Sequence, residues 1–151
     1  MMKEKKQPTG NRRRKSREFA LQALYQWQLA SPGTAELEQQ YRAAEGFSKA
    51  DPQFFLTLVT GAIQIAPDLQ EKMAAYLDRT WQEISPIERG ILLLAGYELI
   101  MQPATPYRVI INEAIELAKS YGGTEGHKYV NGVLDKLAAA VRAEEIARPR
   151  A

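Results

Sequence analysis

Residues 84–101 read ISPIERGILLLAGYELIM. If this segment is a helix, its apolar side chains point in nearly every direction around the axis, and a helix that is apolar on all sides must be enclosed by other helices. We therefore predict that it forms the central helix of the fold. The side chains concerned are Ile91, Leu92, Leu93, Leu94, Ala95, Tyr97, Leu99, Ile100 and Met101.

The ends and the glycines of this segment support the same prediction. Ser85 can cap the free amide groups of the first turn, and Pro86 fits the first helical position. Gly90 and Gly96 each cost about 1 kcal/mol of helix stability relative to Ala, unless a neighbour packs close enough to need the missing side chain. Glu98 interrupts the apolar run, which is shorter than the roughly 20 residues that cross a bilayer. The segment is therefore expected to be buried in protein.

The composition excludes several classes of site. The chain has 151 residues, 45% of them hydrophobic, which is enough for one core or for two small subdomains that share a helix. It contains no Cys and a single His, so disulfides, thiolate zinc sites and cysteine nucleophiles are excluded and little is left to hold a metal. With no apolar leader or membrane segment, the expected location is the cytoplasm.

The net charge of +2 hides a separation between the N-terminus and the body. Residues 1–17 carry a net charge of +7, and the remainder carries −5. Such an asymmetry favours a polyanionic partner, and charge alone leaves RNA, DNA and anionic membrane open. The basic side chains of this head are Lys3, Lys5, Lys6, Arg12, Arg13, Arg14, Lys15 and Arg17.

Helical periodicity continues through the rest of the chain. Residues 1–11 are expected to form a disordered basic arm, and a first helix is expected to begin between Asn11 and Ser16 and to end near Ala30. One side of this helix should face the core, and the opposite side should carry a polar column. The inward residues are Ala20, Ala23, Leu24 and Trp27, and the column is Arg14, Glu18, Gln22 and Tyr25.

No segment alternates in the manner of a strand, so the predicted fold is all-α, with about seven helices in two small packed helical subdomains. Thr34 and Thr105 are expected to cap the second and sixth helices. We expect a helical domain over residues 12–143, with subdomains at about 12–66 and 67–143, and a loose tail at 144–151. The other helices are predicted at about 34–46, 52–66, 68–78, 107–121 and 124–143.

Binding has better candidates than catalysis. The chain lacks a phosphate-cradling glycine loop, and the lone His127 has no partner set for nucleophilic chemistry. Glu113 and Glu116 share a solvated helix face with Lys119, as surface charges do. We predict no catalytic residue, no metal and no cofactor, and hence a protein that is not an enzyme.

The basic segment can fold onto phosphates, and nearby rings can stack unpaired bases, which favours single-stranded RNA. The RRRK run could instead only solubilise the chain, but it continues into an amphipathic helix. Tyr25 could be a rim aromatic, and Tyr129 could lie at the edge of the core. The predicted RNA-binding residues are Arg12, Arg13, Arg14, Lys15, Arg17, Gln22, Lys128 and Tyr129.

Four segments resemble the NusB family of bacterial transcription antitermination factors. They are RRRKSREFALQALYQWQL (12–29), IERGILLLAGYEL (87–99), PYRVIINEAIELAKSYG (106–122) and HKYVNGVLDKL (127–137). The resemblance implies two small helical subdomains, no enzymatic activity, and binding of the boxA element of ribosomal RNA leader transcripts together with NusE, a protein of the small ribosomal subunit. It also implies a complex with NusA, NusG and RNA polymerase that suppresses premature termination.

By matched position, the resemblance assigns Arg13, Arg14, Lys15 and Arg17 to an RNA-binding head and adds Lys128 and Tyr129 to the same surface. Tyr25 and Glu88 match positions associated with NusE contact, although Glu88 could simply be a favourable charge at a helix N-terminus. Two alternatives stay open. The chain could be an RNA-binding module like that of some ribosomal RNA methyltransferases, or a protein adaptor or homodimer that does not bind RNA.

Overall fold

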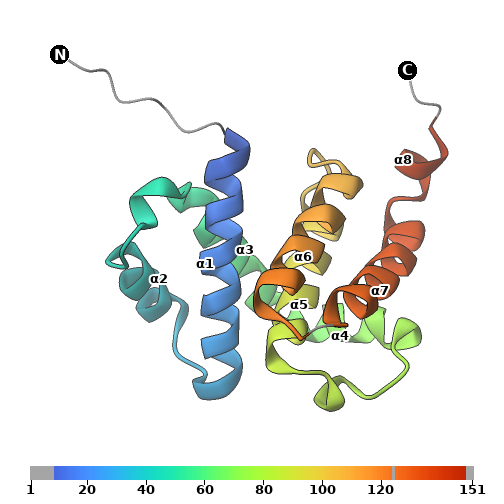
Figure 1. Ribbon diagram of the computed structural model, residues 1–151, viewed down its shortest axis with the longest axis horizontal. Coiled ribbons are helices and arrows are strands. Elements are labelled where there is room, and N and C mark those ends of the chain that lie inside the picture. The colour runs from blue at the N-terminus through green and yellow to red at the C-terminus, as the bar shows by residue number, and fades with distance from the viewer. Residues whose placement is uncertain (1–8, 124, 149–151) are drawn as a thin grey trace. The chain divides into compact units, whose positions relative to one another are not determined.

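The computed structural model describes residues 9–123 and 125–148, with only the backbone of Thr9 described. All of the regular structure in this part of the chain is helical, as predicted (Figure 1). The predicted disorder of residues 1–8 falls outside the described residues. The elements are α1 (Thr9–Ala30), α2 (Thr34–Arg42), η1 (Phe47–Lys49), α3 (Pro52–Gln64), α4 (Ala66–Met73), η2 (Ala74–Tyr76), η3 (Trp81–Glu83), α5 (Pro86–Met101), α6 (Tyr107–Tyr121), α7 (Gly126–Val141) and α8 (Ala143–Ala147).

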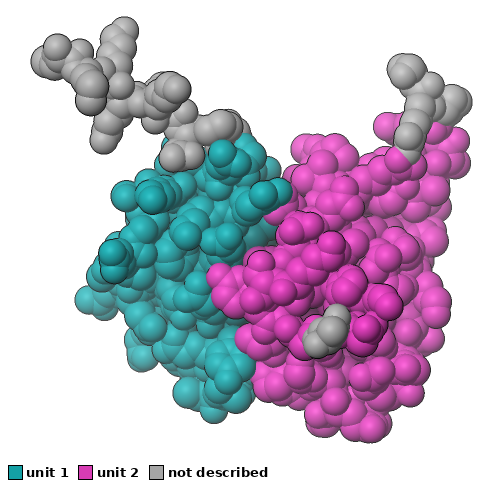
Figure 2. All heavy atoms as spheres, in the orientation of Figure 1, with its two compact units in different colours: residues 1–60 teal, residues 61–151 magenta. Residues whose placement is uncertain are grey.

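The contacts divide the chain into two compact units, Met1–Thr60 and Gly61–Ala151 (Figure 2). The division falls inside α3, whereas the sequence suggested a boundary between residues 66 and 67. Pro67 is the second residue of α4, so it marks the start of a new helix after the break at Ile65. The boundary between the two units lies before this break, between Thr60 and Gly61 in the middle of α3.

Unit 1 is built around a cluster of four aromatic rings. Phe47 lies 5.3 Å from Phe19 and 5.2 Å from Phe55, measured between ring centroids. Tyr41 lies 5.7 Å from Phe55, so one ring each from α1, α2, η1 and α3 meets in this core. On α1, the predicted inward residues Ala20, Ala23 and Leu24 are fully buried, while Trp27 is half-buried.

Several predicted ends in unit 1 shift. Helix α1 begins at Thr9, earlier than the predicted range and within the segment assigned to the disordered arm. Gly33, not Thr34, occupies the N-cap of α2, so the predicted threonine cap is wrong. The predicted start of α3 is confirmed, because Phe54 N donates to Asp51 Oδ1 at 3.0 Å.

Unit 2 is built around α5, which contacts α4, α6 and α7. Ser85 Oγ accepts from Glu88 N at 3.2 Å, which confirms the predicted cap, and residues 90–99 are all buried. A Cβ at Gly96 would lie 3.3 Å from Leu69 Cδ2, so the glycine permits the close packing that the sequence suggested. Met101, at the last turn, is 51% exposed and does not belong to the buried surface.

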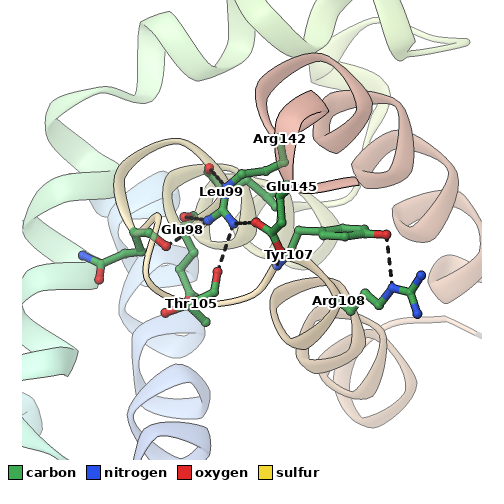
Figure 3. Close-up of polar contacts among 8 residues, drawn as sticks. Glu98, Leu99, Thr105, Tyr107, Arg108, Arg142 and Glu145 are labelled. Atoms are coloured by element: carbon green, nitrogen blue, oxygen red, sulfur yellow. Dashed lines mark hydrogen bonds and ion pairs between the residues drawn. The ribbon is translucent and has the colours of Figure 1, made fainter. Parts of the chain in front are cut away.

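The C-terminal end of α5 is capped by Arg142, a buried residue that directly follows α7 in the sequence (Figure 3). The last carbonyls of a helix lack intrahelical donors, and the Arg142 guanidinium supplies them. It donates to the carbonyl oxygens of Leu99 (2.7 Å), Thr105 (3.0 Å), Gln102 (2.9 Å) and Glu98 (3.3 Å). Arg142 therefore ties the end of α7 to the turn that connects α5 to α6.

Helix α8 corrects two predictions. Residues 144–147 are helical, not a loose tail, because Arg142 also pairs with Glu145. Glu145 Oε2 in turn accepts from Tyr107 N at 2.9 Å, at the start of α6. Thr105 is therefore not the side-chain cap of α6 that its position before Pro106 suggested. Arg148 is exposed, and residues 149–151 lie outside the described residues.

Candidate nucleic-acid interface

The basic start of α1 is docked on the segment that precedes α3. Arg12 Nη2 donates to Ala50 O at 3.0 Å, and Ser16 Oγ donates to Asp51 O at 2.7 Å. Asp51 N donates back to Ser16 Oγ at 2.9 Å. These bonds fix the first turns of α1 while the Arg12 side chain stays exposed. The basic head is thus a structured part of unit 1 from at least residue 12 onward.

Two of the predicted RNA-binding arginines pack on one ring. The Arg13 and Arg17 guanidinium carbons lie 4.3 Å and 5.1 Å from the centroid of the Phe54 ring. Arg13 is half-buried, whereas Arg17 is only 4% exposed. This burial argues against the predicted RNA contact of Arg17, because a nucleic acid cannot reach that guanidinium without moving α1. Helical spacing places residues 13 and 17 on the same side of α1, facing α3.

The exposed column of α1 lies where the sequence placed it. Arg14, Gln22 and Tyr25 are exposed, and Glu18 is half-buried between them. Lys15 is half-buried and pairs with Glu18 at 3.2 Å. A shallow hollow of about 240 Å³ opens at the base of this column, lined by Asn11, Arg14, Lys15, Glu18 and Lys49.

Lys49 is a cation that the sequence analysis missed. It belongs to η1, which follows Gly46 in a left-handed conformation at φ +85°, and this turn brings η1 against α1. A single lysine in a loop carries no periodic signal, so only the contact between α1 and η1 reveals that it joins the basic surface.

In unit 2, Lys128 and Tyr129 lie in the first turn of α7. Lys128 is exposed and pairs with Glu125 at 3.0 Å. Tyr129 is half-buried, and its hydroxyl oxygen is buried without a hydrogen-bond partner among the described residues. Burial, and then the nearby carboxylate of Asp78, raise the pKa of this hydroxyl. One side of the ring is covered by the Arg79 guanidinium, 4.1 Å from the ring centroid.

Glu88, in the first turn of α5, packs against the start of α7. A Cβ at Gly126 would lie 2.5 Å from Glu88 Oε1, so the absence of a side chain at Gly126 makes room for this carboxylate. Glu88 therefore has a packing role beside any role in partner binding. The predicted site residues form two groups, one on α1 in unit 1 and one at the α5 and α7 N-termini in unit 2.

The described residues contain no group of three or more His, Asp or Glu side chains that could hold a metal ion. None of the helices in this part of the chain is long and apolar enough to cross a membrane. The interactions available at the two groups are ion pairing, hydrogen bonding and stacking, which are the means by which proteins hold nucleic acids.

The fold and the surface thus define an all-helical protein of two units with a structured, arginine-rich first helix. The NusB family pattern matches residues 14–139, and the chain belongs to the NusB family. It is 55% identical over 136 residues to the transcription antitermination protein NusB of Nitrosomonas eutropha, covering 90% of this chain and 81% of that protein. It is 52% identical to the protein of the same name from Aromatoleum aromaticum, covering 91% and 95%.

Two solved structures share the fold. T. maritima NusB aligns with a TM-score of 0.79 and 27% identity, covering 95% of this chain and all of that one. A crystal structure of the antitermination factors NusB and NusE in complex with double-stranded RNA aligns with a TM-score of 0.72 over 84% of this chain and 96% of that one. At 22% identity, the second likeness supports the fold alone.

Proposed function

We propose that this chain is a transcription antitermination factor that binds boxA-type single-stranded RNA together with NusE and works with NusA, NusG and RNA polymerase in the cytoplasm. The observation that carries the proposal is the exposed polar column of α1, where Arg14, Gln22 and Tyr25 follow the basic turn at helical spacing. Cations attract the phosphates, and the aromatic and amide groups are suited to unpaired bases or to a protein partner. This role requires binding and no catalytic step.

The salt dependence of RNA binding tests the electrostatic part. Arg12, Arg13, Arg14, Lys15 and Lys128 are exposed or half-buried cations of the two groups. If they neutralise about five phosphates, log affinity for single-stranded RNA should fall with log salt concentration at a slope of about −3 to −4. Fluorescence anisotropy with labelled boxA-type RNA and a scrambled RNA measures both the slope and the sequence preference. A flat salt dependence would contradict the proposal.

A matched pair of arginine substitutions tests the surface. Arg14→Ala should weaken RNA binding several-fold and reduce the salt slope by about 1. Arg42→Ala removes the same charge from α2 in the same unit, where Arg42 pairs with Glu38 at 2.8 Å, and should leave binding unchanged. Equal loss in both variants would point to a diffuse charge effect instead of a surface on α1. Circular dichroism checks that both variants fold.

Partner binding is tested separately. Tyr25→Ala and Glu88→Gln should weaken binding to NusE while RNA affinity of the chain alone changes little. A chain that binds NusE or itself but fails to bind RNA, alone or with NusE, would instead be a protein adaptor. A methyltransferase-type RNA module has less support, because the relatives reported above are named as antitermination proteins.

A further inference from the structure

Arg79 is an exposed residue of unit 2 to which the sequence assigned no role. Its guanidinium lies over the Tyr129 ring, with 4.1 Å from the guanidinium carbon to the ring centroid. Asp78 holds the guanidinium from the side, because Arg79 Nε donates to Asp78 Oδ1 at 2.7 Å and Nη2 donates to Oδ2 at 3.3 Å. This hydrogen bonding lowers the pKa of the Asp78 carboxyl, so the pair is charged at neutral pH.

Because the Arg79 guanidinium lies over the Tyr129 ring, a ligand that approaches from this side meets Arg79 before it meets Tyr129. The Tyr129 ring is half-buried and its hydroxyl oxygen is buried, so the ring is the inner layer. The Arg79 side chain is 39% exposed, so the outer layer is accessible from solvent. A flat guanidinium can stack on an unpaired base while its charge attracts phosphate, and a lysine lacks that plane.

We propose that Arg79 forms the outer layer of a two-layer platform for one unpaired RNA base, with Tyr129 beneath it and Asp78 fixing its orientation. This inference rests on the RNA-binding function proposed above and assigns the stacking to Arg79 instead of directly to Tyr129. Because the carboxylate and the ring already hold the guanidinium, little side-chain freedom remains to be lost when a base stacks. Lys128, exposed in the same first turn of α7 as Tyr129, supplies a phosphate contact.

Another arginine in unit 2 provides a matched control. Arg108 also lies near a tyrosine ring, 5.7 Å from the centroid of Tyr107, but its Nε donates to the Tyr107 hydroxyl at 3.1 Å. Its guanidinium is therefore held at the hydroxyl end of the ring and lies farther from the ring centre than that of Arg79 (Figure 3). Arg108→Ala removes one exposed positive charge from the same unit without removing a stacked plane.

The experiment compares Arg79→Ala, Arg79→Lys and Arg108→Ala in the full chain by fluorescence anisotropy with single-stranded boxA-type RNA. Loss of one stacked base should weaken binding by about 5- to 100-fold in Arg79→Ala. Arg79→Lys keeps the charge but not the plane, so it should lose most of the same affinity and keep the wild-type salt slope. Arg108→Ala should bind as the wild type does. An RNA with 2-aminopurine at successive positions should show fluorescence quenching at one position that Arg79→Ala removes.

The outcomes separate this inference from the proposed function. If the wild type binds RNA and Arg79→Ala binds equally well, the platform is wrong while the RNA-binding function stands. Full recovery in Arg79→Lys would show a phosphate contact and overturn the stacking role. If the wild type fails to bind RNA, the proposed function and the platform both fall. Unchanged circular dichroism spectra show that each variant is folded.

Discussion

Two arginines of unit 2 pair with acidic side chains close by in the sequence, yet they lie in opposite surroundings. Arg142 pairs with Glu145 and is 7% exposed, and its remaining donors go to backbone carbonyls at the end of α5. Arg79 pairs with Asp78 on the surface and lies over a single ring. The difference is in the acceptors and in the burial: Arg142 donates to several backbone carbonyls from a buried position, whereas Arg79 donates to one surface carboxylate and its side chain is 39% exposed. The first therefore serves stability, and the second is available for binding.

The largest effect should come from Arg142→Ala. The substitution removes the guanidinium donors from the carbonyls of Leu99, Gln102 and Thr105 and leaves Glu145 without the cation it pairs with. Removing one partner of a fully buried pair typically costs about 3–5 kcal/mol of unfolding free energy, and because the Glu145 side chain is 29% exposed we expect a loss near the lower end. Urea unfolding followed by circular dichroism measures the loss. Arg42→Ala, at an exposed pair on α2, should cost no more than about 0.5 kcal/mol. Equal urea midpoints for the two variants would show that water replaces the guanidinium without loss.

A smaller, pH-dependent effect is expected from Glu145→Gln. The backbone amide of Tyr107, and then the Arg142 guanidinium, lower the pKa of the Glu145 carboxyl below its ordinary value of 4.5. A lowered pKa in the folded state means that the stabilisation is fully present above 4.5 and is lost as the pH falls through the lowered value. The variant should be less stable than the wild type by about 1 kcal/mol at neutral pH.

This difference should shrink as the pH falls from 4.5 through the lowered pKa of Glu145, because the wild-type carboxyl is then protonated first in the unfolded state and finally in the folded state. Urea unfolding of both proteins across a pH series measures the change. A difference that stays constant down to the acid limit would mean that the Glu145 charge contributes nothing and that only its packing matters.

The same contrast explains what the sequence could predict of the fold. Local periodicity and capping rules predict the central helix α5, its Ser85 cap and the tight packing at Gly96. They do not predict the α5 C-terminal cap, because Arg142 is far along the chain and no pattern marks it as a donor to those carbonyls. Helix α8 was missed for the same reason, since it depends on Arg142 and on Tyr107.

The candidate site was predictable to a similar extent. Arg14, Gln22 and Tyr25 share one face by helical spacing alone, and the structure exposes all three. The burial of Arg17 depends on Phe54, a ring on another helix whose contact with α1 no local rule predicts. Arg79 lies between η2 and η3, where no periodicity exists, and its significance appears only once Tyr129 of α7 is seen beneath it. Sequence patterns therefore miss those residues of the candidate site that only tertiary packing brings together.

The smallest effect on folding should come from Arg79→Ala and from Asp78→Asn. Both side chains are exposed, and surface pairs of this kind contribute little to folding because water solvates the separated charges well. The thermal midpoint of either variant should match that of the wild type within the precision of the melt, while Arg142→Ala unfolds at a clearly lower temperature. A large drop for Arg79→Ala would mean that the guanidinium is needed to cover the Tyr129 ring, and the two arginines would then both be structural. If Arg142→Ala lowers stability and Arg79→Ala lowers only RNA affinity, the two arginines have different roles although each pairs with a nearby acidic residue. The difference would then come from the groups that tertiary packing places around each guanidinium.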